Sequence, residues 1–193
     1  MERRLLDKIV VVDVEATCWR GQPPHGEESE IIEIGACLLD VVSGERAGRA
    51  SLLVRAERST VGDFCAELTT LTQDEVDGGM VFSEACAALR ARFQSDRRLW
   101  ASYGDYDRRM FDRQCDHRGV PYPFGKGHIN VKSLLAVTYG LRKEVGLARA
   151  MERLGLSLEG THHRGSDDAW NVAAVLWRII HSARPALRKA RSG

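Results

Sequence analysis

Residues 8–19 read KIVVVDVEATCW, and this stretch decides the fold. Ile9 to Val12 form a β-branched run preceded by charged residues, which indicates a strand buried on both faces. Alternate strand residues point to the same side, so the carboxylates of Asp13 and Glu15 should project together from its end. Two like charges so placed repel each other unless a cation lies between them. The pair alone is equally consistent with a strand cap beside a solvated glutamate, so the remaining sequence must decide.

The composition indicates one globular domain. The chain has 193 residues, 44% of them hydrophobic and 28% charged, which is ordinary for a soluble protein with a sizeable core. We expect a single domain over residues 1–183 and a basic C-terminal tail over 184–193. No apolar run approaches the roughly 20 residues that a membrane span requires, and no secretory segment is evident. The expected location is therefore the cytoplasm, without membrane contact.

The net charge and the cysteine content argue against several kinds of binding site. The formal net charge of +1 argues against a protein that grips long duplex DNA through many phosphates, but it permits a small site for a few nucleotides. The five cysteines are odd in number and include no CxxC pair. This pattern predicts reduced thiols in or near the core rather than disulfides or a zinc site.

The order of the predicted elements indicates an α/β fold. Residues 31–39 and 49–55 read as further strands joined by a turn, so the first three strands should form an antiparallel meander. Residues 84–93 have apolar side chains at helical spacing, and residues 98–103 read as a fourth strand. A helix between strands is typical of a crossover to a parallel neighbour, so the sheet should be mixed. Glu30 and Glu33 are interpreted as surface charges.

Two later acids and a histidine pair complete the candidate site. Asp107 begins the helix after the fourth strand, and Asp168 lies in the first turn of a last helix over 167–183, five residues after His163. Each has a plain alternative, because acids are favourable near helix N-termini and loop histidines are commonly solvated. His162 is a rival to His163 by type, and it has the same spacing to Asp167.

Six segments taken together resemble one enzyme family. They read VVDVEATCW, SEIIEIGACLLD, FCAELTTLTQDEV, YGDYDRRMF, INVKSLLA and HHRGSDDAWN, and they extend from residue 11 to residue 171. Their order is similar to that of the DEDDh 3′-to-5′ exonucleases. Finer features resemble the 3′-exoribonuclease branch, which includes histone-mRNA and small-RNA trimming enzymes.

The resemblance implies a ribonuclease-H-like fold, with a five-stranded mixed sheet of three antiparallel strands followed by parallel strands, flanked by helices. It also implies a site for two divalent cations, Mg²⁺ or Mn²⁺, for which carboxylate oxygens are suitable ligands. His163 is then the general base, since its pKa lies near neutrality. The implied metal ligands are Asp13, Glu15, Asp107 and Asp168.

The resemblance further implies how substrate is held. Backbone groups of Ala16 and Thr17 should contact the terminal nucleotide, and Phe64 and Tyr106 should stack on its base. Phe64 could instead belong to the core, and Asp105 is an alternative to Asp107 as the ligand.

The implied activity is hydrolysis of single-stranded nucleic acid from its 3′ end to nucleoside 5′-monophosphates, with RNA favoured over DNA. The alternatives are a proofreading exonuclease of a DNA polymerase and a non-catalytic module that only holds 3′ ends.

Overall fold

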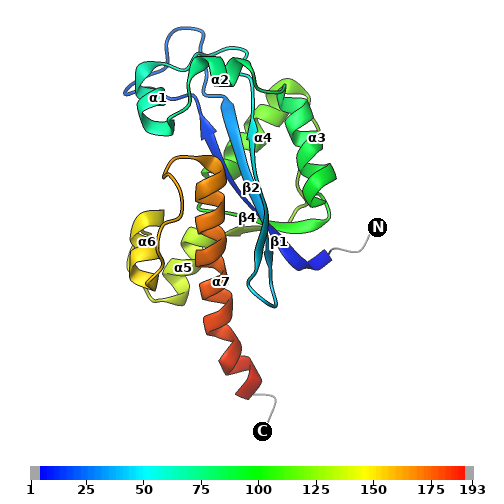
Figure 1. Cartoon of the computed structure of the whole chain (residues 1–193), viewed down its shortest axis with the longest axis vertical. Helices are drawn as coiled ribbons and strands as arrows, with labels where there is room; N and C mark the ends of the chain where they lie inside the picture. Colours follow the sequence, from blue (N-terminus) through cyan, green and yellow to red (C-terminus); the bar gives the residue numbers. More distant parts are fainter. Residues whose placement is uncertain (1–4, 190–193) are drawn as a thin grey trace.

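The computed structural model describes residues 5–189, with only the backbone described for residues 185–189 (Figure 1). Residues 1–4 and 190–193 lie outside the description. A single five-stranded sheet has the order β3-β2-β1-β4-β5. β1 is antiparallel to β2, which is antiparallel to β3, whereas β1, β4 and β5 are parallel neighbours. The predicted mixed α/β sheet is confirmed. The strands are β1 (Leu5–Ala16), β2 (Ile31–Asp40), β3 (Arg46–Leu53), β4 (Arg98–Ser102) and β5 (His128–Asn130).

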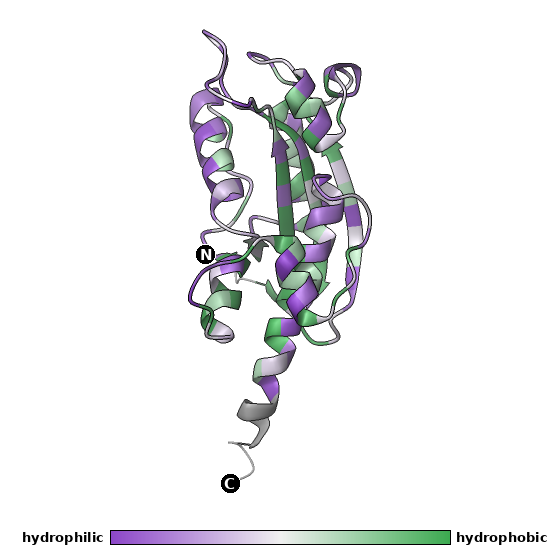
Figure 2. Ribbon diagram, turned by 90° about the vertical axis from the view of Figure 1, so that its left-hand side faces the viewer, coloured by the Kyte–Doolittle hydropathy of each residue, from purple (hydrophilic) through white to green (hydrophobic). Residues whose placement is uncertain are grey.

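Helices cover both faces of this sheet, because β1 contributes apolar side chains alternately to two cores. Val10, Val12 and Val14 pack with α3 and α4, whereas Ile9 and Val11 pack with α5, α6 and α7. Figure 2 shows hydrophobic residues along the strands and polar residues on the outer helices. The helices are α1 (Asp63–Thr69), α2 (Gln73–Asp77), α3 (Phe82–Phe93), α4 (Tyr106–Arg118), α5 (Val131–Thr138), α6 (Leu147–Leu154) and α7 (Gly165–Lys189).

Two strands differ from the sequence prediction. β3 begins three residues earlier and ends two residues earlier than the predicted 49–55. The Asp40 side chain accepts hydrogen bonds from the amides of Val42 and Ser43, so the hairpin turns at once and pairing resumes at Arg46. β5 has only three residues, which is too short for a periodic pattern to locate it.

The last helix is longer than predicted. α7 begins at Gly165 and continues to Lys189, so the expected boundary at residue 184 falls inside a helix. Basic residues are favourable near a helix C-terminus, and Arg184 donates to the carbonyl oxygens of Val41 and Val42. Residues 190–193 of the expected tail lie outside the described residues.

All five cysteines are free thiols, and four of them are buried, as predicted. Among the helices within residues 5–189, none combines the length and the apolar character that crossing a bilayer would require.

Candidate active site

A cleft of about 400 Å³ opens at the carboxyl end of β1. Its walls come from β1, the start of α4, the start of α6 and the loop that leads into α7. The structure therefore brings together side chains that lie up to 155 residues apart in sequence, from Asp13 to Asp168. All five predicted catalytic residues line this cleft, and so does the rival histidine: they are Asp13, Glu15, Asp107, His162, His163 and Asp168.

Three of the acids converge closely. One carboxylate oxygen each from Asp13, Glu15 and Asp168 lies within 4.8 Å of the others. Asp13 and Glu15 share a side of β1 because they are two residues apart, and Asp168 comes from the first turn of α7, where the helix dipole favours an anion. The three oxygens have the spacing of ligands around a common cation.

This convergence is electrostatically costly for the protein alone. Burial raises the pKa of Asp13 well above its usual range, and the charges of Asp107 and Glu15 add to the rise. Burial, followed by the charge of Asp168, raises the pKa of Glu15 to about 8. A cation among these groups would stabilise their ionised forms, since an opposite charge offsets both desolvation and mutual repulsion.

Asp107 lines the same cleft and is held by the backbone of β1. Its Oδ1 accepts a hydrogen bond from the amide of Val14 at 2.9 Å, and burial raises its pKa to about 6. Asp105 does not line the cleft. Its carboxylate instead accepts from Asn130 Nδ2 at 3.1 Å and lies 3.3 Å from Arg108. Of the two acids considered at this position, the structure places Asp107 in the cleft.

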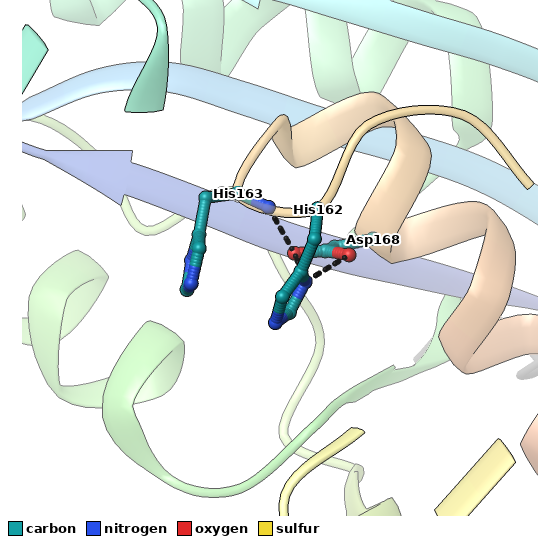
Figure 3. Close-up of side chains that lie close together, drawn as sticks. All are labelled: His162, His163 and Asp168. Carbon is teal, nitrogen blue, oxygen red and sulfur yellow. Dashed lines mark hydrogen bonds and ion pairs between the residues drawn. The ribbon is translucent and has the colours of Figure 1, made fainter. Parts of the chain in front are cut away.

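The two histidines lie side by side over Asp168 (Figure 3). Their rings stack with centroids 4.0 Å apart, and His162 Nδ1 lies 2.9 Å from Asp168 Oδ2. The His163 amide donates to the same oxygen at 3.0 Å, which helps hold His163 at a φ of 63°, a left-handed conformation uncommon for a residue other than glycine. Burial and the neighbouring His162 lower the pKa of His163.

Asp167 is directed out of the cleft. It forms an ion pair with Arg49 and accepts a hydrogen bond from the amide of Thr161 at 2.6 Å. The alternative frame, in which His162 pairs with Asp167, therefore does not form, and both histidines contact Asp168.

The start of α7 packs against β2 through a close backbone contact between Gly165 and Gly35. A Cβ added to Gly35 would lie 1.8 Å from the carbonyl carbon of Gly165, so only glycine permits this approach. Glu33 Oε2 accepts from the Gly165 amide at 3.0 Å and lies 3.3 Å from Arg164 Nε, while its Oε1 accepts from Ser51. The glutamate thus anchors the helix that carries Asp168.

The prediction that Glu30 and Glu33 are surface charges is wrong. Their relative exposures are 2% and 0%. Glu30 accepts hydrogen bonds from Arg58 N and Ser59 Oγ and is paired with Arg118. Sequence position alone missed these acids, because their partners come from distant segments.

We expect Glu33→Ala to lower kcat by about 10–100-fold. This is the usual effect of removing a residue that positions a metal ligand without binding the metal, here Asp168. Glu33→Gln should recover most of the activity, because the amide can still bond Gly165 and Ser51. Steady-state kinetics with thermal melting would measure both effects. Glu30→Ala is the matched control, since it also removes a buried glutamate but should lower stability without a comparable loss of kcat. Equal losses of kcat in both alanine variants would contradict this positioning role.

The substrate residues predicted from the sequence are distributed unevenly. Ala16 and Tyr106 line the cleft, and Tyr106 is 51% exposed. Thr17 does not line it: its amide donates to the Glu30 carbonyl, and its hydroxyl bonds Ser59. Phe64 lies outside the lining, half-buried beneath the guanidinium of Arg20.

Sequence reasoning missed several residues of the cleft. Leu68 lies one turn beyond Phe64 on α1, so helical spacing could have suggested it. Val14 and Cys18 belong to the stretch that carries Asp13 and Glu15, whereas no local pattern marks Gly146 and Leu147, which tertiary packing brings to the cleft. The missed lining residues are Val14, Cys18, Leu68, Tyr103, Gly146 and Leu147.

The sequence profile of the RNase T family, described as Exonuclease, matches residues 10–176, which is most of the chain and includes every acid and histidine of the cleft. The chain belongs to the RNase T exonuclease family. The prediction of a DEDDh-type exonuclease with a ribonuclease-H-like fold is confirmed.

Relatives within the RNase T exonuclease family include human 3′-5′ exoribonuclease 1, which is 32% identical over 185 residues. That match covers 90% of this chain and 52% of the human protein, so the chain spans about half the length of this curated relative. The nuclease domain of 3′hExo, a DEDDh family member, has been solved bound to rAMP. It superposes with a TM-score of 0.84 at 29% identity, covering 94% of this chain and 96% of that one. DEDDh exonucleases depend on divalent metal ions.

Proposed function

We propose that this chain is a metal-dependent 3′-to-5′ exonuclease that hydrolyses single-stranded nucleic acid, RNA in preference to DNA, to nucleoside 5′-monophosphates. The observation that carries the proposal is the convergence of Asp13, Glu15 and Asp168 in one cleft, which Asp107 and two histidines also line. The preference for RNA is supported by the exoribonuclease relative and by the rAMP bound to the similar nuclease domain.

The residues of the cleft suit a divalent cation. Asp13, Glu15 and Asp168 supply hard oxygen ligands at compatible spacing, and Asp107 would complete the set for a second ion. We propose Mg²⁺ as the natural ion, with Mn²⁺ as a substitute. When bound, such ions lower the pKa of a water nucleophile and stabilise the leaving 3′-oxygen.

The proposed general base is His163. Its ring makes no side-chain hydrogen bond with the described residues, so its nitrogens are available to a water in the cleft. Its lowered pKa keeps the imidazole neutral, and thus able to accept a proton, to a lower pH than an ordinary histidine. His162 is the second candidate, because its contact with Asp168 could orient its other nitrogen.

For substrate placement, we propose that Tyr106 stacks on the terminal base and that Ala16 lies against the terminal nucleotide. Base stacking on an aromatic side chain is worth about 1–3 kcal/mol and has little sequence preference. Phe64 and Thr17 do not line the cleft, whereas Leu68, on the same helix as Phe64, does.

The deciding experiment follows a 5′-labelled RNA 12-mer and the matched DNA 12-mer over time with Mg²⁺. A ladder that shortens one nucleotide at a time, faster for RNA, supports the proposal. Binding without cleavage would support a module that only holds 3′ ends. A third substrate, the DNA 12-mer annealed with a mispaired 3′ end, tests the proofreading alternative, which a strong preference for that end would support.

We also expect Mg²⁺ to stabilise the protein more at pH 8 than at pH 5. The folded pKa values of Glu15 and Asp107, about 8 and about 6, lie above their usual values of 4.5 and 3.8. The metal-free fold is therefore favoured at low pH, and this advantage is lost as pH rises through about 6 to 8, where ionised ligands also bind metal best.

The measurement for this expectation is thermal melting with and without Mg²⁺. An ion present at about 100 times its dissociation constant adds about 2.7 kcal/mol, which corresponds to about 5–10 °C for a domain of this size. NaCl at equal ionic strength is the control. A shift of the same size at both pH values would contradict the expectation.

We propose the cytoplasm as the site of action. The free thiols of Cys18, Cys37, Cys65, Cys86 and Cys115 suit its reducing conditions.

A further inference from the structure

A second hollow, of about 440 Å³, lies beside the catalytic cleft. It is formed by the loop over residues 140–145 and by α6. Four exposed cationic side chains line it: Arg142 and Lys143 from the loop, and Arg149 and Arg153 from the helix. Arg149 and Arg153 are four residues apart, so they share one face of α6. The hollow is therefore bordered by positive charge on two sides.

The charge of this hollow is not neutralised within the protein. None of the four cations forms an ion pair or a hydrogen bond with another residue in the described part of the chain. The acid in the lining, Glu144, is engaged on its far side, where it accepts from Ser133 Oγ at 2.5 Å and lies 3.7 Å from Lys132 Nζ. For a chain with a net charge of +1, this is a local concentration of unpaired positive charge.

Consecutive residues of one chain segment line the hollow and the catalytic cleft. Val145 lines the hollow, and the next two residues, Gly146 and Leu147, line the cleft. Tyr103, whose ring borders the cleft, donates its hydroxyl to the Val145 carbonyl at 2.8 Å and fixes this junction. The basic hollow is therefore the neighbour of the cleft at this segment, on the side where a nucleic-acid strand with its 3′ end among the acids could extend.

We propose that this basic hollow binds the phosphodiester backbone of the substrate, on the 5′ side of the nucleotides held in the cleft. The inference rests on the proposed function, and it adds a binding site for the body of the strand. Lysine and arginine side chains bind phosphates by charge, so the contact is independent of base sequence. The catalytic cleft is lined by acidic residues, which repel the phosphates of a nucleic acid. The basic hollow beside it would supply the attraction that holds the substrate.

The test measures binding without catalysis. Fluorescence anisotropy in EDTA would give dissociation constants for 5′-fluorescein-labelled oligouridylates of three and twelve nucleotides, with wild type and with the double variant Arg149→Ala/Arg153→Ala. We expect the 12-mer to bind the double variant about tenfold more weakly. The slope of the log association constant against log salt concentration is negative, and its magnitude should decrease by about 1.4, or about 0.7 for each lost contact on a single strand. The ratio of the 3-mer to the 12-mer dissociation constant should fall toward 1.

Lys126→Ala/Arg178→Ala is the matched control, because it removes two exposed cations without a partner among the described residues and outside both hollows of this region. It should bind both oligomers as wild type does. The proposal is overturned if the Arg149→Ala/Arg153→Ala variant keeps the wild-type affinity and salt slope for the 12-mer. It is also overturned if this variant loses affinity equally for both oligomers. Failure of the wild type to cleave RNA with Mg²⁺ would instead overturn the proposed function, so the two failures are distinguishable.

Discussion

Asp13→Asn is expected to lower RNA cleavage at least about a thousandfold, because it removes a charged ligand from the centre of the acid cluster. Asp13 lies within ligand spacing of Glu15 and Asp168, so an amide in its place weakens the attraction for a cation without changing the size of the side chain. Single-turnover cleavage of a 5′-labelled RNA with saturating Mg²⁺ measures the loss.

The same variant should be more stable than wild type in the absence of metal. Burial and neighbouring carboxylates raise the pKa of Asp13, so its ionisation disfavours the folded state as pH rises. The neutral amide avoids this penalty, and its melting temperature in EDTA should exceed that of wild type by more at pH 8 than at pH 5. Lower stability at both pH values, or retained cleavage, would refute the assignment of Asp13 as a metal ligand.

His163→Ala should lower kcat by about a hundredfold to ten-thousandfold, the range that a positioned general base contributes. His162→Ala should cost less, about 10–100-fold, which is the usual effect of removing a side chain that orients a metal ligand, here Asp168. Each variant serves as a control for the other, because each removes one imidazole from the same cleft and the two rings stack at 4.0 Å.

The pH profile of kcat separates the two histidines further. If His163 is the base, the His162→Ala profile should retain the acidic limb. This limb should move to higher pH, because His162 lowers the pKa of His163 in the wild type. His163→Ala should lose the limb. A greater loss from His162→Ala, together with loss of its acidic limb, would transfer the role to His162. Metal-dependent stabilisation should persist in both variants, which distinguishes a lost base from a lost ligand.

The sequence predicted those features that depend on local spacing. The β-branched run of β1 and the two-residue separation of Asp13 and Glu15 specify a buried strand with two carboxylates on one side, and the structure has both. The length of β3 and the start of α7 were predicted less well, because hydrogen bonds donated to the Asp40 carboxylate and backbone packing against Gly35 determine them. Strand pattern and helix propensity carry little information about such contacts.

Long-range burial accounts for the other errors. Glu33 has no local feature that distinguishes it from a surface glutamate, yet the start of α7 covers it completely. Tyr103 and Leu147 reach the cleft only because β4 pairs with β1 and α6 packs against α7. The choice between Asp105 and Asp107 likewise depends on how α4 begins, and only the fold directs one carboxylate toward Val14.

The backbone contact between Gly35 and Gly165 has a consequence for ionic selectivity. It fixes how far the α7 carboxylate stands from the β1 carboxylates, without compressible side chains between the two elements. Mg²⁺ requires bonds of about 2.0–2.1 Å, whereas Ca²⁺ takes about 2.3–2.6 Å and more ligands. The contact limits how far Asp168 can move from Asp13 and Glu15, so we expect this glycine pair to favour the shorter bonds of the smaller ion.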